Sequence, residues 1–142
     1  MRRPQIIEHP RARNASAAAG LLEFRKVHGA GNDFILIGGP FAPADLPALA
    51  RELCGRRTGI GADGLVISTP LAAGPAAYDV RCLNPDGSEA TMCGNALRCA
   101  ALSAAADHGH TEVDMLMAGV WHRGGPQLPS VECLLALRSA LE

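Results

Sequence analysis

A chain of 142 residues is the size of one ordinary domain and can bury a sizeable core. Hydrophobic residues make up 48% and charged residues 19%, with a formal net charge of −1, which argues against a disordered chain and against a basic surface for nucleic acid. Arg98 and Ser103 interrupt the longest apolar stretch and Asp107 ends it, so no membrane span is expected. These features favour a soluble globular domain.

Residues 1–20, "MRRPQIIEHPRARNASAAAG", carry arginines but no long apolar core, which argues against a secretory signal. We expect a disordered N-terminal extension or an upstream start codon chosen in error, with an Arg-rich targeting peptide as the alternative. The five cysteines are scattered without CxxC spacing. That pattern predicts reduced thiols in a cytoplasmic protein rather than a disulfide framework.

The patterned part of the chain is predicted to span residues 21–123. "LLEFRKVHGAGNDFILIGG" predicts a hairpin: a short strand, a Gly-rich turn, and a second strand at Phe34–Ile37. Asp45 is expected to cap a helix whose apolar residues recur at helical spacing. These apolar residues are Leu46, Leu49, Ala50 and Leu53.

Two further strands and a second helix follow. Leu65–Ile67 is a buried-strand pattern, and Tyr78, Val80 and Cys82 alternate with charged residues, as a half-buried strand requires. "NPDGS" at 84–88 predicts a turn, and residues 95–106 predict a helix that is apolar nearly all round. We therefore expect an α+β fold, with a mixed or antiparallel sheet around a central buried helix.

The last part of the chain has a different texture. "WHRGGPQLPS" at 121–130 predicts a loop, and "VECLLALRSALE" at 131–142 could form a short amphipathic helix. Residues 124–142 are accordingly interpreted as a divergent tail.

Two tempting motifs do not fit their usual chemistry. "GIGADG" at 59–64 satisfies G-x-G-x-x-G, but a predicted helix precedes it and a strand follows, which is the reverse of a dinucleotide fingerprint. Glycines that shape a tight turn explain it better. Cys93 and Cys99 are six residues apart and would point to different faces of a helix, so no metal site is expected.

Cys93 is the candidate catalytic residue. It directly precedes the buried helix, where the positive end of the helix dipole lowers a thiol pKa. The free amides around Gly94 and Asn95 can bind a carboxylate or a developing oxyanion. The alternative, a structural cysteine, stays open from the residues alone. For Cys99, Cys54 and Cys82 we favour the structural interpretation, as small hydrophobic residues of the core.

Four blocks, in order, resemble the N-terminal half of the diaminopimelate epimerase family. They are "HGAGNDF" at 28–34, "RRTGIGADG" at 56–64, "NPDGSEATMCGNALRC" at 84–99 and, weakly, "MAGVWHR" at 117–123. The resemblance implies one α/β lobe of a two-lobed, cofactor-independent isomerase that converts LL- to meso-diaminopimelate for lysine and peptidoglycan synthesis. Each lobe of such an enzyme supplies one active-site cysteine.

The resemblance also implies roles for individual residues. Cys93 matches the first catalytic cysteine, and the substrate-contact positions are Asn32, Asn84, Gly94 and Asn95. Inversion at an α-carbon needs a base on each face, because a single base tends to return the proton to the side from which it came. Asn32 and Asn84 offer donors and acceptors for the ammonium and carboxylate groups of an amino acid. For Asn32 alone, tolerance of left-handed backbone in the turn remains the alternative.

Some features depart from the family pattern. Ala96 and Leu97 replace smaller residues, which could tighten the helix start, and Cys82 and Leu83 replace a commoner Ile and aromatic pair. The family chain is about twice as long, so the second lobe and its cysteine are expected to be missing, and Cys133 is left unassigned. Alternatives are a racemase of another amino acid, or a non-catalytic remnant or binding domain. An uncovered lobe interface predicts self-association, for example as a homodimer.

Overall fold

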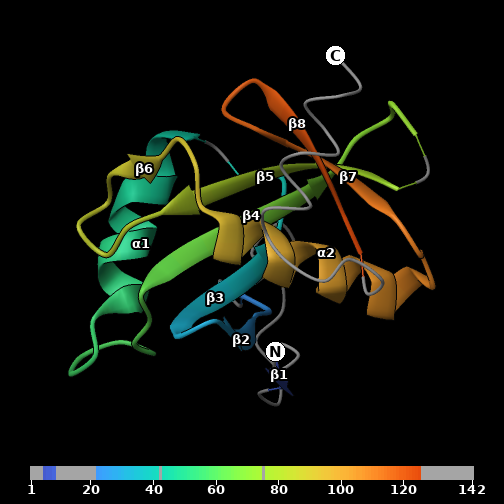
Figure 1. Cartoon of the computed structure of the whole chain (residues 1–142). Coiled ribbons are helices and arrows are strands. Elements are labelled where there is room, and N and C mark those ends of the chain that lie inside the picture. The colour runs from blue at the N-terminus through green and yellow to red at the C-terminus, as the bar shows by residue number, and fades with distance from the viewer. Residues whose placement is uncertain (1–4, 9–21, 42, 75, 126–142) are drawn as a thin grey trace.

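The computed structural model describes residues 5–8, 22–41, 43–74 and 76–125. In these residues eight strands form one sheet, and two α-helices pack against it (Figure 1). The strand order is β1-β2-β3-β4-β5-β7-β8, and the short strand β6 pairs with β5 outside this path. The β3–β4 and β5–β7 pairs are parallel and the others are antiparallel. The predicted α+β fold with a mixed sheet is confirmed.

The predicted hairpin consists of β2 (Arg25–Gly29) and β3 (Asn32–Gly38). Its two connecting residues, Ala30 and Gly31, have φ angles of 50° and 91°. Two consecutive positive φ values are typical of the type I′ turn, whose twist matches that of the flanking strands. This tight turn makes Asn32 the first residue of a strand rather than a turn residue.

A strand lies inside the segment that was predicted to be a disordered extension. β1 (Gln5–Glu8) pairs antiparallel with β2, with Gln5 opposite His28. The prediction is therefore wrong for these four residues. Strand β2 would otherwise leave its outer backbone groups unpaired, and β1 satisfies them. A four-residue strand with only two apolar side chains carries too little pattern to be found in the sequence. The rest of the predicted extension lies outside the described residues.

The first helix, α1 (Leu46–Cys54), follows a short 3₁₀ turn at Pro43–Asp45. The predicted apolar stripe is confirmed: Leu46 and Ala50 are buried, and Leu49 and Leu53 are partly buried against the same cluster. Asp45 occupies the N-cap position, but its side chain makes no capping hydrogen bond. The predicted cap is wrong in this respect, because the preceding 3₁₀ turn holds Asp45 in helical rather than extended backbone geometry.

Three strands occupy the middle of the chain. β4 (Gly64–Pro70) and β5 (Ala77–Leu83) form a long antiparallel pair. β6 (Glu89–Ala90) returns after the "NPDGS" turn and pairs with the end of β5. Alternate residues of β4 point to opposite faces: Val66 joins one core cluster, and Leu65 and Ile67 join the other. The strand is apolar throughout because both faces of the sheet are covered.

The second helix, α2 (Gly94–His108), packs against one face of the sheet, and α1 packs against the other (Figure 1). The prediction of a central buried helix is confirmed, since side chains on nearly every side of α2 are buried as far as Ala105. The helix ends at Gly109, whose φ of 72° is left-handed and whose amide donates to the Ala105 carbonyl oxygen. This is the glycine-terminated helix end that the αL conformation favours.

The last two strands are β7 (Val113–Met117) and β8 (Val120–Gly124). They form a hairpin, with Met117 opposite Val120. The predicted loop at 121–130 is therefore wrong for residues 121–124, where pairing with the more apolar β7 imposes a strand on a weakly patterned segment. The predicted helix at 131–142, and Cys133 with it, lie outside the described residues.

Candidate functional site

The candidate residues lie at one end of the sheet. Phe34 of β3 is opposite Gly64 of β4, and Leu65 of β4 is opposite Leu83 of β5. This register brings together the start of β3, the start of β4 and the end of β5, and α2 begins shortly after the β5–β6 turn. Segments that are far apart in sequence, including those of Asn32 and Asn95, thereby meet at the same end of the sheet.

Cys93 occupies the N-cap position of α2, with extended backbone angles φ −148° and ψ 97°. Its side chain is partly exposed and packs against the core cluster on the α2 face of the sheet. A hydrogen bond from Cys82 and the nearby amides of Ala96 and Asn95 lower the pKa of the Cys93 thiol to about 6, against the opposing effect of burial. The interaction with Cys82 is the largest cause of this lowered pKa, and the amides at the start of α2 add to it although the sulfur makes no side-chain capping bond. At neutral pH Cys93 is therefore mainly a thiolate.

Cys82 is a buried core cysteine, as expected, but it also interacts with Cys93. It lies on β5 and is 2% exposed, as the structural interpretation required. Its hydrogen bond to Cys93, together with burial, raises the pKa of the Cys82 thiol well above its usual range. Cys82 thus remains a protonated donor, and Cys93 is the acceptor. The pair divides into one thiol and one thiolate because only Cys93 faces helix amides.

Asn32 and Asn95 are brought together directly. The Asn95 side-chain amide donates to Asn32 Oδ1 at 2.7 Å, and Asn32 Nδ2 donates to Asp63 Oδ2 at 3.2 Å. The positive φ angles of the turn belong to Ala30 and Gly31, not to Asn32. The alternative that Asn32 serves only to tolerate left-handed backbone is therefore excluded, and its side chain is oriented from both sides.

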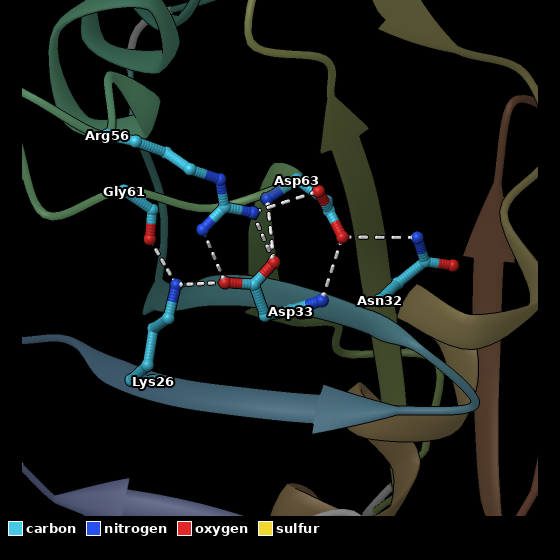
Figure 2. A network of polar contacts seen from close by, with 6 residues as sticks. All are labelled: Lys26, Asn32, Asp33, Arg56, Gly61 and Asp63. Atoms are coloured by element: carbon cyan, nitrogen blue, oxygen red, sulfur yellow. Dashed lines mark hydrogen bonds and ion pairs between the residues drawn. The ribbon is translucent and has the colours of Figure 1, made fainter.

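A charged network supports this arrangement from behind (Figure 2). Arg56 donates to Asp33 Oδ1 at 2.8 Å and to Asp63 Oδ1 at 3.0 Å, and so joins the two carboxylates. Lys26 Nζ donates to Asp33 Oδ2 at 2.7 Å and also bonds the Gly61 carbonyl oxygen. The hydrogen bond from Arg56, followed by that from Lys26, holds the pKa of the Asp33 carboxyl well below its usual range despite partial burial.

Two backbone bonds make the network part of the hairpin itself. The Asp33 amide donates to Asp63 Oδ2 at 3.1 Å, and the Asp63 amide donates to the Asp33 carbonyl oxygen at 2.9 Å. The Gly-rich segment between α1 and β4 is thus fastened to the start of β3. Because Asn32 directly precedes Asp33, its position follows from the same bonds.

The glycines of "GIGADG" act as the turn interpretation requires. A Cβ at Gly59 would lie 2.2 Å from the Glu52 carbonyl oxygen, and Gly61 has a φ of 85°. The motif lies between α1 and β4, so a helix precedes it and a strand follows. The segment functions as a compact turn that delivers Asp63 to the network.

Asn84 and Gly94 are placed near the site but differ in their bonding. Asn84 is exposed, and its side-chain amide donates to Ser88 Oγ at 3.0 Å within its own turn. The described hydrogen bonds do not join Asn84 to Asn32 or Asn95. Gly94 is the first residue of α2, so its amide has no partner within the helix. Asn84 is therefore held within its own turn through Nδ2, and its side-chain oxygen makes no bond among the described hydrogen bonds.

The remaining expectations concern the core. Cys99 is 1% exposed, and burial raises its thiol pKa to about 12; burial also raises the pKa of Cys54 in the α1 cluster. Both fit the structural interpretation. Ala96 and Leu97, which depart from the family pattern, are fully buried in the α2 cluster and so fill the core.

Sequence reasoning missed Asp63, Arg56 and the Cys82–Cys93 contact. Arg56 and Asp63 both lie in the quoted block 56–64, where a pair of opposite charges flanks the glycines. That flanking was an available signal, but only the fold brings Asp33 between them. For Cys82 there was no signal beyond its being a cysteine where the family has a hydrocarbon side chain.

Other features of the described residues lie away from this site. A cavity of about 310 Å³ at the far end of α2 is lined by Arg25, Tyr78, Ser103, Asp107 and others, and Arg25 there pairs with Asp107 at 2.6 Å. No three His, Cys, Asp or Glu side chains of the described ranges gather as a metal site. None of the helices in those ranges is long and apolar enough to cross a membrane.

Comparison with known proteins agrees with the quoted blocks. The family model for diaminopimelate epimerase matches residues 24–120. Diaminopimelate epimerase of Desulforudis audaxviator is 55% identical over 85 residues, which cover 58% of this chain and 30% of that relative. The enzymes of Moorella thermoacetica and Gluconobacter oxydans are 51% and 54% identical, over 55% and 56% of this chain and 28% and 32% of their own lengths.

The chain thus spans about a third of the length of the relatives it matches. The matched region contains both asparagines of the hydrogen-bonded pair, the whole charged network and Cys93 at the start of α2. With the family model covering more than half of the sequence, this chain belongs to the diaminopimelate epimerase family.

Proposed function

We propose that this lobe supplies one of the two acid/base thiols of a cofactor-independent amino-acid isomerase, with diaminopimelate as its substrate. The observation that carries the proposal is Cys93: a partly exposed thiol at the start of a buried helix, with a pKa lowered to about 6, next to the Asn32–Asn95 pair. A thiolate at neutral pH is the state that a proton-abstracting base needs.

The surroundings of Cys93 suit an α-amino acid. The amides of Gly94 and Asn95 would receive the substrate carboxylate, because they lie at the positive end of α2 and have no partner within the helix. Asn32 Oδ1 and Nδ2 are held by Asn95 and Asp63, so the side chain is oriented before a ligand arrives. Fixed donors near the carboxylate stabilise the negative charge that develops when the α-proton leaves.

Cys93 removes the α-proton from one face and a second thiol protonates the opposite face. The second thiol would come from outside this lobe, either from a second lobe of the kind that the family scheme requires or from a second copy of the chain. A homodimer would also cover the edge at which the site opens. Within the described residues Cys82 and Cys99 are too buried to serve as that second base.

The proposal is tested by α-proton exchange in heavy water. The purified, reduced 142-residue chain is incubated with LL-diaminopimelate, and deuterium incorporation and stereochemistry are followed together. We expect slow α-deuterium incorporation with little inversion, because one face lacks a base. Cys93→Ala should reduce the exchange by about 10²- to 10⁴-fold, the usual contribution of a general base. Cys99→Ala is the matched control and should leave the exchange unchanged.

Other outcomes identify the alternatives. Exchange with a different amino acid but not with diaminopimelate would assign a racemase with another substrate. Absence of exchange with any amino acid, in a folded chain with a reactive Cys93, would indicate a non-catalytic binding domain. Rapid inversion that depends on Cys93 would show that two copies complete each other's site. We also propose a cytoplasmic location, which agrees with the unpaired thiols of the described residues.

A further inference from the structure

We infer that Cys82 and Cys93 form a reversible disulfide, in which Cys93 is the thiol that is oxidised first and Cys82 is the resolving cysteine. The inference starts from the strand register. Cys82 of β5 lies opposite Ala90 of β6, and Cys93 follows only three residues later, at the start of α2. The β5–β6 turn therefore folds the second cysteine back onto the first.

The two side chains are in contact in the folded chain. The interaction between the two thiols is the largest cause of the pKa shift of each, and Cys82 lies in the cluster between α2 and the sheet against which Cys93 packs. Two thiols that interact within one cluster can be joined by changes of the side-chain torsions. The loop that the bridge closes, residues 82–93, is short, and the pairing of β5 with β6 already folds it back on itself.

The other described cysteines are less suitable partners. Cys54 belongs to the core cluster on the opposite face of the sheet. Cys99 lies within α2, six residues after Cys93, so the helix directs the two side chains to different sides. Neither makes a hydrogen bond with Cys93. The fold thus selects Cys82 from among these thiols.

The chemistry balances with a hydroperoxide as the oxidant. The Cys93 thiolate attacks one oxygen of hydrogen peroxide, the O–O bond breaks, and the products are Cys93 sulfenic acid and hydroxide, which takes a proton to become water. Cys82 then loses its proton and attacks the Cys93 sulfur. The S–S bond forms, the S–O bond breaks, and a second water leaves. Two thiols and one peroxide give one disulfide and two waters.

The reactivities of the two thiols match this order. Cys93 is partly exposed and mainly thiolate, so it meets the peroxide first; Cys82 is buried and protonated, so it is protected until the sulfenic acid forms beside it. An external dithiol reverses the bridge by thiol–disulfide exchange. One consequence rests on the proposed function: if Cys93 is the catalytic base, its sulfur cannot accept a proton while it is in the disulfide, so the oxidised chain lacks that base.

Peptide mapping tests the inference on the full chain. Trypsin cleaves after Arg81 and Arg98, so residues 82–98 form one peptide that contains both Cys82 and Cys93, while Cys99 falls in the next peptide. The reduced protein is treated with one equivalent of hydrogen peroxide, alkylated with iodoacetamide under denaturing conditions, and digested. We expect the 82–98 peptide without alkyl groups and lighter by two hydrogen atoms, and dithiothreitol should restore both alkylation sites.

Variants make the assignment specific. In Cys82→Val, which keeps an apolar side chain of similar size, the peroxide product should remain as Cys93 sulfenic acid that dimedone traps, and with excess peroxide it should advance to sulfinic acid. Cys99→Ala is the matched control and should form the bridge as the parent does. Circular dichroism verifies that both variants fold.

Three results would overturn the inference. The first is a parent 82–98 peptide that carries sulfinic acid on Cys93 and an alkylated Cys82. The second is a bridge from Cys93 to a different cysteine or to a second chain. The third is a bridge that persists in Cys82→Val. None of these readouts involves an amino-acid substrate, so failure of the isomerase proposal and failure of the disulfide are seen separately.

Discussion

The two helices begin in different ways, and the difference explains why only one of them carries candidate chemistry. The start of α1 is covered and has fewer donors. Pro47 in its first turn lacks an N–H, and the "PDG" turn packs against this end of the helix, since a Cβ at Gly87 would lie 2.9 Å from the Pro47 carbonyl oxygen. α2 begins with Gly94 and Asn95, whose amides have no partner within the helix, after a cysteine in extended geometry. A helix start becomes reactive when its donors are open and a nucleophile adjoins them.

The two helices also differ in burial. α1 is amphipathic, with an apolar stripe facing the sheet and exposed residues such as Arg51 and Glu52 on the other side. α2 is buried on nearly all sides until its last turn. A rigid, enclosed helix keeps the amides around Cys93 in place, which is what electrostatic preorganisation requires.

The largest expected effect tests this difference in burial. Leu97 of α2 is fully buried, so Leu97→Ala should lower the free energy of unfolding by about 2–5 kcal/mol through lost transfer energy and the cavity that remains. Leu49 of α1 is only partly buried, and Leu49→Ala is the matched comparison with a smaller loss. Urea unfolding followed by circular dichroism measures both. Equal losses would contradict the different roles of the two helices.

The next effect compares the start of α2 with its middle. The pKa of Cys93 is about 6 and that of Cys99 about 12, so at pH 7 their thiolate fractions differ by about 10⁵-fold. The lower nucleophilicity of the less basic thiolate offsets much of this, which leaves a difference of about 10²-fold before burial is counted. Brief iodoacetamide treatment and peptide mapping should show Cys93 labelled first, with a rate that rises through about pH 6 and then levels off.

The same experiment examines the source of the low pKa. Cys82→Val removes the hydrogen bond that is its largest cause, so the midpoint of Cys93 labelling should move to higher pH. Cys99→Ala should leave the midpoint in place. Equal labelling of Cys93 and Cys99 in the parent chain would refute the assignment of Cys93 to an open helix start.

A smaller effect concerns the network that positions Asn32. The pKa of Asp33 is lower in the folded state than its usual value, so this carboxylate stabilises the fold above about pH 4, and the contribution is lost as the pH falls through the folded-state pKa. Asp33→Asn should lower the free energy of unfolding by about 1–2 kcal/mol at pH 7, and this difference between parent and variant should become smaller toward pH 3. Because Arg56 is largely exposed, added salt should also reduce the difference.

The start of α1 provides the control for that prediction. Asp45 is exposed and makes no capping hydrogen bond, so Asp45→Asn should change the free energy of unfolding by less than about 0.5 kcal/mol. Urea midpoints measured from pH 3 to pH 7 compare the two variants. If the pH dependence of the free energy of unfolding persisted in Asp33→Asn but disappeared in Asp45→Asn, the stabilising carboxylate would be Asp45 rather than Asp33.

Much of the fold could be predicted because its elements carry local patterns. The hairpin, α1, β4, β5 and α2 were each predicted from periodicity, turn residues or apolar runs, and their ends differ by a few residues. β1 and β8 were missed because a short or weakly patterned segment becomes a strand only through its partner. β7, for which no element was predicted, has the same dependence on β5 and β8.

In the candidate site, too, some features follow from local sequence and others from tertiary packing. By itself the sequence determined that a cysteine precedes a buried helix, that an asparagine follows a tight turn, and which family the quoted blocks resemble, since these are features of neighbouring residues. Only the tertiary structure decided that Asn95 bonds Asn32, that Arg56 joins Asp33 to Asp63, and that Cys82 touches Cys93. These contacts depend on strand order and register, which arise from packing across the whole sheet and are written in no single stretch of the chain.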